Sequence, residues 1–294
     1  MTRDEAERLL ALSREAGSLG PDDRVNLTEA VRFFAANGDD ESAAELAENV
    51  WRLWLVAGDV SGGRELLRIA LDAGEGTLTH ARALALYADG LLAFRAGAQA
   101  ESEERNEAAL EEARTIGDRE VETLALVGLS RVALRDGDYP RVRSRAAEAL
   151  ELARVLGDDA RVMPLHLLAA GTRLGGDRDR AIELYTESLE LNQRLGDTRM
   201  VGVELHNIGH VELHRGNLET AEQFFAECQD IRSPDDPYDN AMTHLNKAAL
   251  AFHHGDKEGA SDELELTRTT LAEAGIVLDP DDAFEVHWLQ ERIR

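Results

Sequence analysis

Glycine residues recur at an almost constant interval, and this interval constrains the fold more than any other feature of the sequence. Between successive glycines of one series the intervals are 39, 40, 39, 40 and 39 residues: Gly58, Gly97, Gly137, Gly176, Gly216 and Gly255. A second series falls between them, at Gly117, Gly157 and Gly196. The segments between these turns have helix length and carry apolar residues at helical spacing. Such a period indicates one supersecondary unit that is copied and stacked.

Each copy is predicted to be a pair of antiparallel helices. Glycine after the last periodic residue is the expected end of a helix, because it adopts the left-handed conformation at little cost. Pro140 lies just inside the helix that follows Gly137, where a missing N–H costs nothing. Ala, Leu and Glu dominate a chain with only 5% aromatic residues, which favours close-packed helices over a sheet. The predicted fold is an all-α solenoid of about seven helix hairpins.

The hairpins divide the chain into three predicted segments of one continuous solenoid. Residues 1–40 form a degenerate hairpin with helices near 3–17 and 24–36, and residues 41–276 form six repeats. Residues 277–294 form a C-terminal capping helix, because a stacked array needs a cover for its last apolar face. Its Asp residues are placed to cap the helix, and Trp288 and Leu289 are predicted to cover that face.

Small residues recur at fixed distances from the glycines of the first series. Seven positions before the glycine stand Gly90, Ser130, Ala169, Gly209 and Ala248, and twelve after it stand Ala70, Ala109, Ala149, Ser188 and Cys228. This pattern resembles the tetratricopeptide repeat, whose small residues let paired helices approach closely. The usual proline is missing, and the second helix is about one turn longer and ends at Leu-Gly-Asp. The resemblance implies a right-handed superhelix.

The longer repeat is similar to those of kinesin light chains and of large bacterial ATP-dependent regulators. Residues 26–71, with Trp51 and Trp54, resemble the junction after the nucleotide-binding module of LuxR-type and actinobacterial transcriptional regulators. The sequence has no G-x-x-x-x-G-K-[ST] loop and no basic helix-turn-helix. The resemblance therefore implies a ligand- or partner-sensing superhelix without its own ATPase or DNA-binding domain.

The overall charge limits the possible partners. A net charge of −26 disfavours binding to nucleic acid or to an anionic membrane, since phosphate contacts need clustered Lys and Arg. No segment approaches the roughly 20 apolar residues of a membrane span. The first residues form a charged amphipathic helix and not a signal peptide. With a single cysteine, Cys228, the chain is predicted to be cytoplasmic.

Positive charge is nevertheless concentrated on one predicted surface. By analogy with tetratricopeptide proteins, the first helix of each hairpin lines a concave groove, with groove positions 13, 10, 9, 6, 3 and 2 residues before the glycine. In six units these positions hold five Arg, five His and only two acids, Glu45 and Glu48. The groove is therefore predicted to be neutral to basic in an acidic protein. The predicted ligand-binding residues are Arg52, Tyr87, Arg95, Arg131, Arg135, His166, Arg173, His206, Asn207, His210, His214, Asn246 and His253.

Three histidines of this set, His206, His210 and His214, lie four residues apart and share one side of a helix. They fit a solvated helix face, a ligand groove or a metal site. The segment "HVELH" is not the H-E-x-x-H of zinc proteases, because Glu212 stands one position late. Cys228 falls at a packing position, which favours a buried small residue over a nucleophile.

These patterns predict a non-enzymatic scaffold, without cofactor or metal, that binds a protein or peptide segment in the groove. Arg side chains would attract the acidic groups of that partner, or a small anionic ligand. Histidine would change charge between pH 5 and 8, so binding would strengthen as the pH falls through about 6.5. The alternatives are a ligand-sensing transcriptional regulatory module and, as a minor one, a metal-dependent enzyme.

Overall fold

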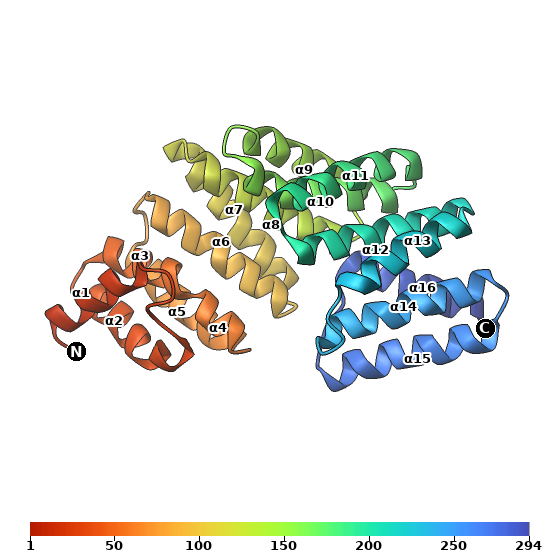
Figure 1. The fold of residues 1–294 in the computed structure, drawn as a ribbon. Helices are drawn as coiled ribbons and strands as arrows, with labels where there is room; N and C mark the ends of the chain where they lie inside the picture. The colour runs from red at the N-terminus through yellow and green to blue at the C-terminus, as the bar shows by residue number, and fades with distance from the viewer. Residues whose placement is uncertain (294) are drawn as a thin grey trace. The chain divides into compact units, whose positions relative to one another are not determined.

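The computed structural model describes residues 1–293, and every regular element in this range is helical (Figure 1). In chain order the elements are α1 (Arg3–Ser13), η1 (Pro21–Asp23, a 3-10 helix), α2 (Arg24–Ala36), α3 (Asp40–Val50), α4 (Arg52–Val56), α5 (Val60–Ala73), α6 (His80–Arg95), α7 (Gln99–Ile116), α8 (Arg119–Arg135), α9 (Tyr139–Ala153), α10 (Asp158–Leu174), α11 (Arg178–Leu195), α12 (Thr198–Arg215), α13 (Leu218–Ile231), α14 (Pro237–His253), α15 (Lys257–Glu273) and α16 (Pro280–Ile293). The predicted all-α fold of helix hairpins is confirmed. Among these helices none is long and apolar enough to cross a lipid bilayer.

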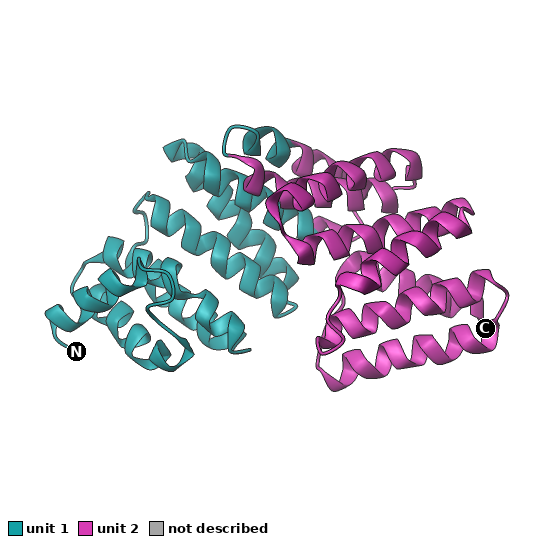
Figure 2. Cartoon of the chain, viewed as in Figure 1, with its two compact units in different colours: residues 1–132, 148–156 teal, residues 133–147, 157–294 magenta. Residues whose placement is uncertain are grey.

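The helices form two compact units (Figure 2). Unit 1 comprises Met1–Val132 and Glu148–Leu156, and unit 2 comprises Ala133–Ala147 and Gly157–Arg294. The division falls inside α8 and α9, so each of these helices contributes residues to both units. A continuous solenoid through both units stays a prediction.

The turn inside each hairpin explains the interval between the glycines. The glycines of the first series all have a left-handed φ, between 72° and 94°. The residue that follows the glycine is often Asp, and its carboxylate accepts a hydrogen bond from the first turn of the next helix. Asp59 accepts from the Gly62 N–H at 3.0 Å, and Asp256 from the Gly259 N–H at 2.9 Å. The Gly-Asp pair thus ends one helix and begins the next.

Unit 1 has a continuous apolar core that begins in the N-terminal hairpin. The helices α1 and α2 lie within the predicted segment 1–40, although α1 ends at Ser13 and not near residue 17. Trp51 and Trp54 are 2% and 3% exposed, so they pack among the early helices. The side chain of Trp54 lies against α5, where a Cβ on Gly63 would come within 3.0 Å of it. Close helix contact at this point requires glycine.

Unit 2 uses the same close approach between α12 and α13. A Cβ added to Gly209 would lie 2.4 Å from Cε1 of Phe225, so only glycine fits there. Cys228 is fully buried, and its thiol donates to the Gly202 carbonyl at 3.2 Å, as expected for a packing position. Leu289 of α16 is also fully buried in the core formed with α14 and α15. The C-terminal helix therefore covers the last hairpin, but it has a second set of contacts.

Candidate functional site

The second set of contacts joins α16 to the first helices of three hairpins in unit 2. On α10, α12 and α14 these contacts come from a group of basic, aromatic and imidazole side chains. We call this group the α16-binding face: Arg173, His206, His210, His214, Tyr238 and His253. Five of these six residues belong to the groove residues predicted from the sequence, and Tyr238 was not predicted. The helical spacing of α12 places His206, His210 and His214 on one side, as expected.

Glu285 of α16 is at the centre of the contacts. Its carboxylate accepts a hydrogen bond from the guanidinium of Arg173. The same carboxylate lies 2.9 Å from Nε2 of His214 and 3.4 Å from Nδ1 of His210. Only 1% of Glu285 is exposed. Burial would raise the pKa of this carboxyl, but Arg173 and His210 outweigh burial and hold the pKa well below its usual value.

Asp282 makes the second connection. It lies 3.0 Å from Nε2 of His206 and accepts a hydrogen bond from the hydroxyl of Tyr238. Burial lowers the pKa of His206 to about 3, so the imidazole is neutral at physiological pH and donates its Nε2–H to Asp282. Burial would raise the pKa of Asp282, but the hydrogen bonds from His206 and Tyr238 outweigh burial and lower it.

His166 on α10 is charged, unlike the neutral His206. Its Nδ1 lies 3.1 Å from Oε1 of Glu204, which also accepts from the Ser188 hydroxyl at 2.7 Å. Burial disfavours the charged imidazole, but Glu204 and the charge of Asp281 outweigh it and raise the pKa of His166 to about 9. Asp281 is itself buried, and burial together with Asp282 raises its pKa. His166 is therefore charged at neutral pH beside two carboxyl groups.

An aromatic contact extends the site toward α14. The indole ring of Trp288 stacks on the His253 imidazole with a centroid distance of 5.9 Å and an interplanar angle of 6°. Its edge contacts are with Phe252 at 5.5 Å and His214 at 4.7 Å. The stacked ring gives α16 one apolar anchor beside its carboxylates.

The two asparagines of the predicted groove support the basic side chains. The Asn207 side-chain oxygen accepts a hydrogen bond from Arg173, and Asn246 lies 3.1 Å from Nε2 of His210. Both amides thus fix the position of a side chain that contacts α16, and in this conformation they do not face a ligand backbone. Their 1% and 5% exposure agrees with such a supporting position.

Asp281 and Asp282 lie in the first turn of α16, and their side chains are buried beside α10 and α12. Capping of this helix by the Asp residues of the last segment stays a prediction. One sequence-based expectation is wrong at this site. The histidines were expected to change charge between pH 5 and 8. The pKa of His206 is about 3 because burial dominates there, and that of His166 is about 9 because Glu204 and Asp281 outweigh burial.

The three histidines of α12, which fit a metal site by their spacing, instead contact carboxylates of α16. His206 bonds Asp282, whereas His210 and His214 share Glu285. Within residues 1–293 no group of three or more His, Cys, Asp or Glu side chains has an arrangement that could hold a metal ion.

The remaining predicted residues lie elsewhere. Arg52 is exposed, with its guanidinium 4.6 Å from the centre of the Trp51 ring, and Arg95 is exposed at the end of α6. Tyr87 is buried in the core of unit 1, at 6% exposure. Arg131 and Arg135 are half-buried on α8, the first in unit 1 and the second in unit 2. Their binding roles stay predictions.

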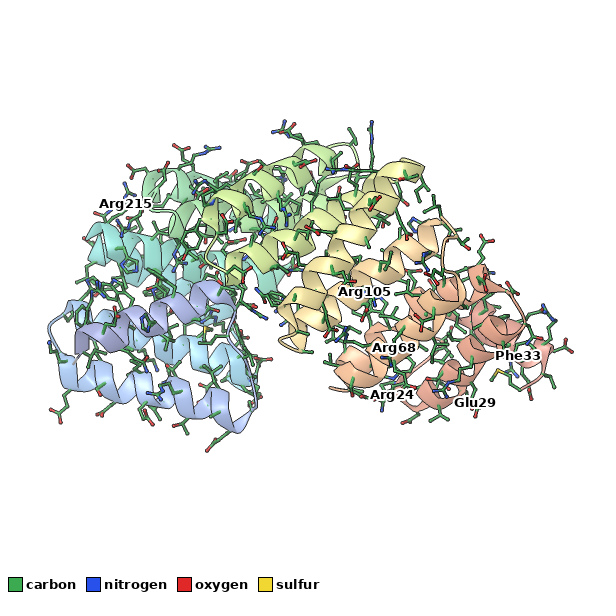
Figure 3. All side chains as sticks on the ribbon, turned by 180° about the vertical axis from the view of Figure 1, so that it is seen from behind. Arg24, Glu29, Phe33, Arg68, Arg105 and Arg215 are labelled. Carbon is green, nitrogen blue, oxygen red and sulfur yellow. The ribbon has the colours of Figure 1, made fainter. Side chains whose placement is uncertain are left out.

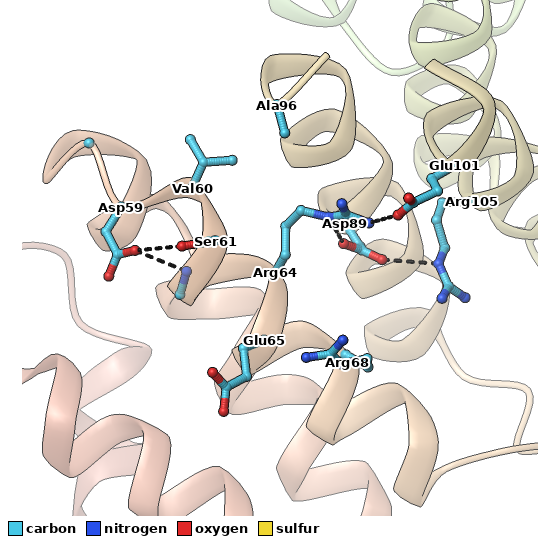
Figure 4. A pocket seen from close by; sticks show the side chains of 12 residues that line it. Asp59, Val60, Ser61, Arg64, Glu65, Arg68, Asp89, Ala96, Glu101 and Arg105 are labelled. Carbon is cyan, nitrogen blue, oxygen red and sulfur yellow. Dashed lines mark hydrogen bonds and ion pairs between the residues drawn. The ribbon is translucent and has the colours of Figure 1, made fainter. Parts of the chain in front are cut away.

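Unit 1 contains a cavity that the sequence did not indicate. It has a volume of about 900 Å³ between α5, α6 and α7 (Figure 4). Asp89, whose side chain is 3% exposed, pairs there with Nε of Arg64 at 2.9 Å and Nε of Arg105 at 3.0 Å. Figure 3 labels Arg68 of α5 and Arg105 of α7, which both line this cavity. Three Arg and four Asp or Glu residues line the cavity, so its charges nearly balance and select no ligand of one sign.

No protein family model matches the chain, and no curated protein matches its sequence. Solved structures do match. The apo form of RapI has a TM-score of 0.67 at 11% identity, over 85% of this chain and 98% of RapI. NprR in complex with its cognate peptide NprX has a TM-score of 0.64 at 15% identity, over 84% and 71% of the two chains.

A putative kinesin light chain of Podosopora anserina, with tetratricopeptide-like repeats, has a TM-score of 0.53 at 15% identity, over 63% of this chain and 92% of that one. At such identities the likeness shows the fold. The predicted tetratricopeptide-like fold is thereby confirmed, whereas the resemblance to LuxR-type regulators stays a prediction.

Proposed function

We propose that the chain is a non-enzymatic scaffold that binds a protein or peptide segment carrying acidic side chains. The proposed binding surface is the α16-binding face of unit 2. One observation carries the proposal: an acidic segment, α16, already lies on the residues that the sequence singled out for binding acids. Arg173 and His214 pair with Glu285, and His206 pairs with Asp282.

The chemistry of this face suits carboxylates. Arg173 presents a planar fork of N–H donors, held by Asn207, and such a fork binds a carboxylate with defined orientation. The neutral imidazole of His206 supplies one further N–H donor. The surrounding side chains are buried, so these hydrogen bonds form in an environment with little water.

Two structural neighbours support a peptide, and not a small anionic ligand, as the class of partner. NprR was solved with its cognate peptide NprX, and a Rap protein was solved with the competence and sporulation factor. The fold they share with this chain has therefore accommodated such ligands in other proteins.

Binding of synthetic peptides to the full chain tests this function. The probe is a fluorescein-labelled peptide of residues 277–293, whose carboxylates are the ones that the face already binds. Its control carries Asn, Asn and Gln in place of Asp281, Asp282 and Glu285. We expect at least about tenfold tighter binding of the acidic peptide by fluorescence anisotropy, because each lost charged hydrogen bond costs about 1.5–3 kcal/mol.

Variants of the protein locate the site. R173Q should weaken binding of the acidic peptide, whereas R215Q should leave it unchanged, since Arg215 pairs with Glu212 and Asp179 outside the face (Figure 3). Equal binding of both peptides, or equal binding by both variants, would contradict the proposal. An arm with inorganic phosphate distinguishes a small anionic ligand from a peptide: competition at low concentration would favour the small ligand.

A further inference from the structure

The contact surface of α16 defines a pattern of side chains on one helix. The residues that turn inward are buried at positions 281, 282, 285 and 289, and the spacing of four places three of them along one stripe. The opposite side carries exposed Phe284, His287 and Glu291. The α16-binding face thus contacts one side of a helix. Counted from residue 281, that side carries acids at the first, second and fifth positions, Trp at the eighth and Leu at the ninth.

This stripe differs from that of an ordinary capping helix. A cap covers an apolar end of a solenoid, and its inward residues are then apolar. Three of the four buried residues of α16 are carboxylic acids, and the fourth is Leu289. The partly buried Val286, Trp288 and Ile293 add apolar contacts around them. Burial of ion pairs adds specificity, but its desolvation cost offsets most of the attraction, so such pairs contribute little net stability. The buried acids of α16 therefore contribute more to the specificity of its docking than to the stability of the docked state.

We propose that α16 is an intramolecular ligand of the α16-binding face, and that an acidic amphipathic helix of a partner protein displaces it. The inference rests on the proposed function, because it assigns the class of partner and the regulation of the same surface. In the closed state the donors of the face are occupied by α16. A partner helix therefore gains access only to the fraction of molecules in which α16 has left.

Removal of Glu285 and removal of Arg173 then have opposite effects on the apparent affinity for a partner helix, although the two residues form one ion pair. Loss of Glu285 weakens α16 and leaves the donors of the face intact, so it raises the fraction of open molecules. Loss of Arg173 weakens α16 as well, but it also removes the main donor for the partner. Apparent affinity is the intrinsic affinity reduced by the fraction that is competent to bind. A purely structural helix would give no such opposition.

The test uses the full chain and the labelled peptide of residues 277–293. We expect E285Q to bind this peptide at least about tenfold more tightly than the wild type, and R173Q to bind it more weakly. The matched control is E291Q, which removes an exposed acid from the same helix, with 58% of its side chain accessible. E291Q should bind like the wild type. W288A, which removes the stack on His253, is a second opening variant and should bind more tightly.

The outcomes separate the inference from the function. If wild type, E285Q and W288A bind the acidic peptide equally, the displacement of α16 is refuted while the proposed function stands. If none of them binds it, both are refuted. Circular dichroism and thermal unfolding show whether each variant folds, and a folded E285Q that binds no better than E291Q counts against the inference. Dimerisation of E285Q without peptide binding would assign the face to a second copy and would also overturn it.

Discussion

Protonation of His166 gives a quantitative test of the buried charges in unit 2. The folded chain raises the pKa of this imidazole from 6.5 to about 9 through Glu204, whose Oε1 lies 3.1 Å away, and through Asp281. Such a rise corresponds to about 3 kcal/mol in favour of the folded state when the imidazole is charged. The histidine is only 9% exposed, so screening by water reduces this amount little.

The sign of the pH dependence follows from the direction of the shift. The folded chain binds the proton more tightly than the unfolded chain does. The stabilisation is therefore complete below pH 6.5 and is lost as the pH rises through about 9. H166Q keeps a side chain that bonds to Glu204 but has no charge to lose. The advantage of the wild type over H166Q should shrink by about 2–3 kcal/mol between pH 6 and pH 9.5.

Urea denaturation at constant ionic strength, followed by circular dichroism, measures this difference at the two pH values. Titrating groups outside this charge cluster act equally on both proteins and cancel in the comparison. An NMR titration of the His166 imidazole gives its pKa directly. A pKa at or below 6.5, or curves of wild type and H166Q that run parallel in pH, would refute the account of this charge cluster.

Three further predictions concern packing, turns and the thiol. G209A should lose about 1–3 kcal/mol by thermal denaturation, because its Cβ would meet Phe225, whereas G202A, with its nearest neighbour at 3.5 Å, should lose far less; equal losses would contradict the packing. D256A removes the hydrogen bond to the Gly259 N–H and should cost about 1 kcal/mol in urea unfolding, and an unchanged midpoint would show that the cap is dispensable. Burial raises the pKa of the Cys228 thiol, so a thiol reagent at pH 8 should label the folded chain far more slowly than the urea-unfolded one.

The hairpins could be predicted from the sequence because their signals are local. Each turn is specified by a left-handed glycine such as Gly58 and by the following capping residue, Asp59. Small residues such as Gly209 mark the places where two consecutive helices touch. These features lie within one repeat, and their recurrence makes each of them visible several times.

The role of α16 could not be predicted in the same way. Its contacts join residues far apart in sequence: 71 positions separate His214 from Glu285, and 112 separate Arg173 from Glu285. Nothing repeats at such a distance. Asp281 and Asp282 also stand in the first turn of a helix, where acids are common, so local preference does not reveal their contacts with α10 and α12. The spacing of the acids, Trp288 and Leu289 along one helix face is the signal that could have indicated a docked helix.

The protonation states of the histidines could not be predicted from the sequence for a related reason. His166 and His206 occupy equivalent positions in adjacent repeats, yet the pKa of one is raised and that of the other is lowered. Both imidazoles are buried, and the difference comes from Glu204, which faces His166, and from His210, which lies beside His206. A repeat pattern gives equivalent positions but not their surroundings.

Hydrogen exchange of α16 tests the central claim most directly. The full wild-type chain is measured by mass spectrometry with and without a saturating peptide of residues 277–293, synthesised with heavy isotopes so that its fragments are distinguishable. The account predicts faster exchange of the chain's own residues 280–293 when the peptide is bound, with α10 and α12 still protected. Unchanged protection of residues 280–293 while the peptide is bound would contradict it.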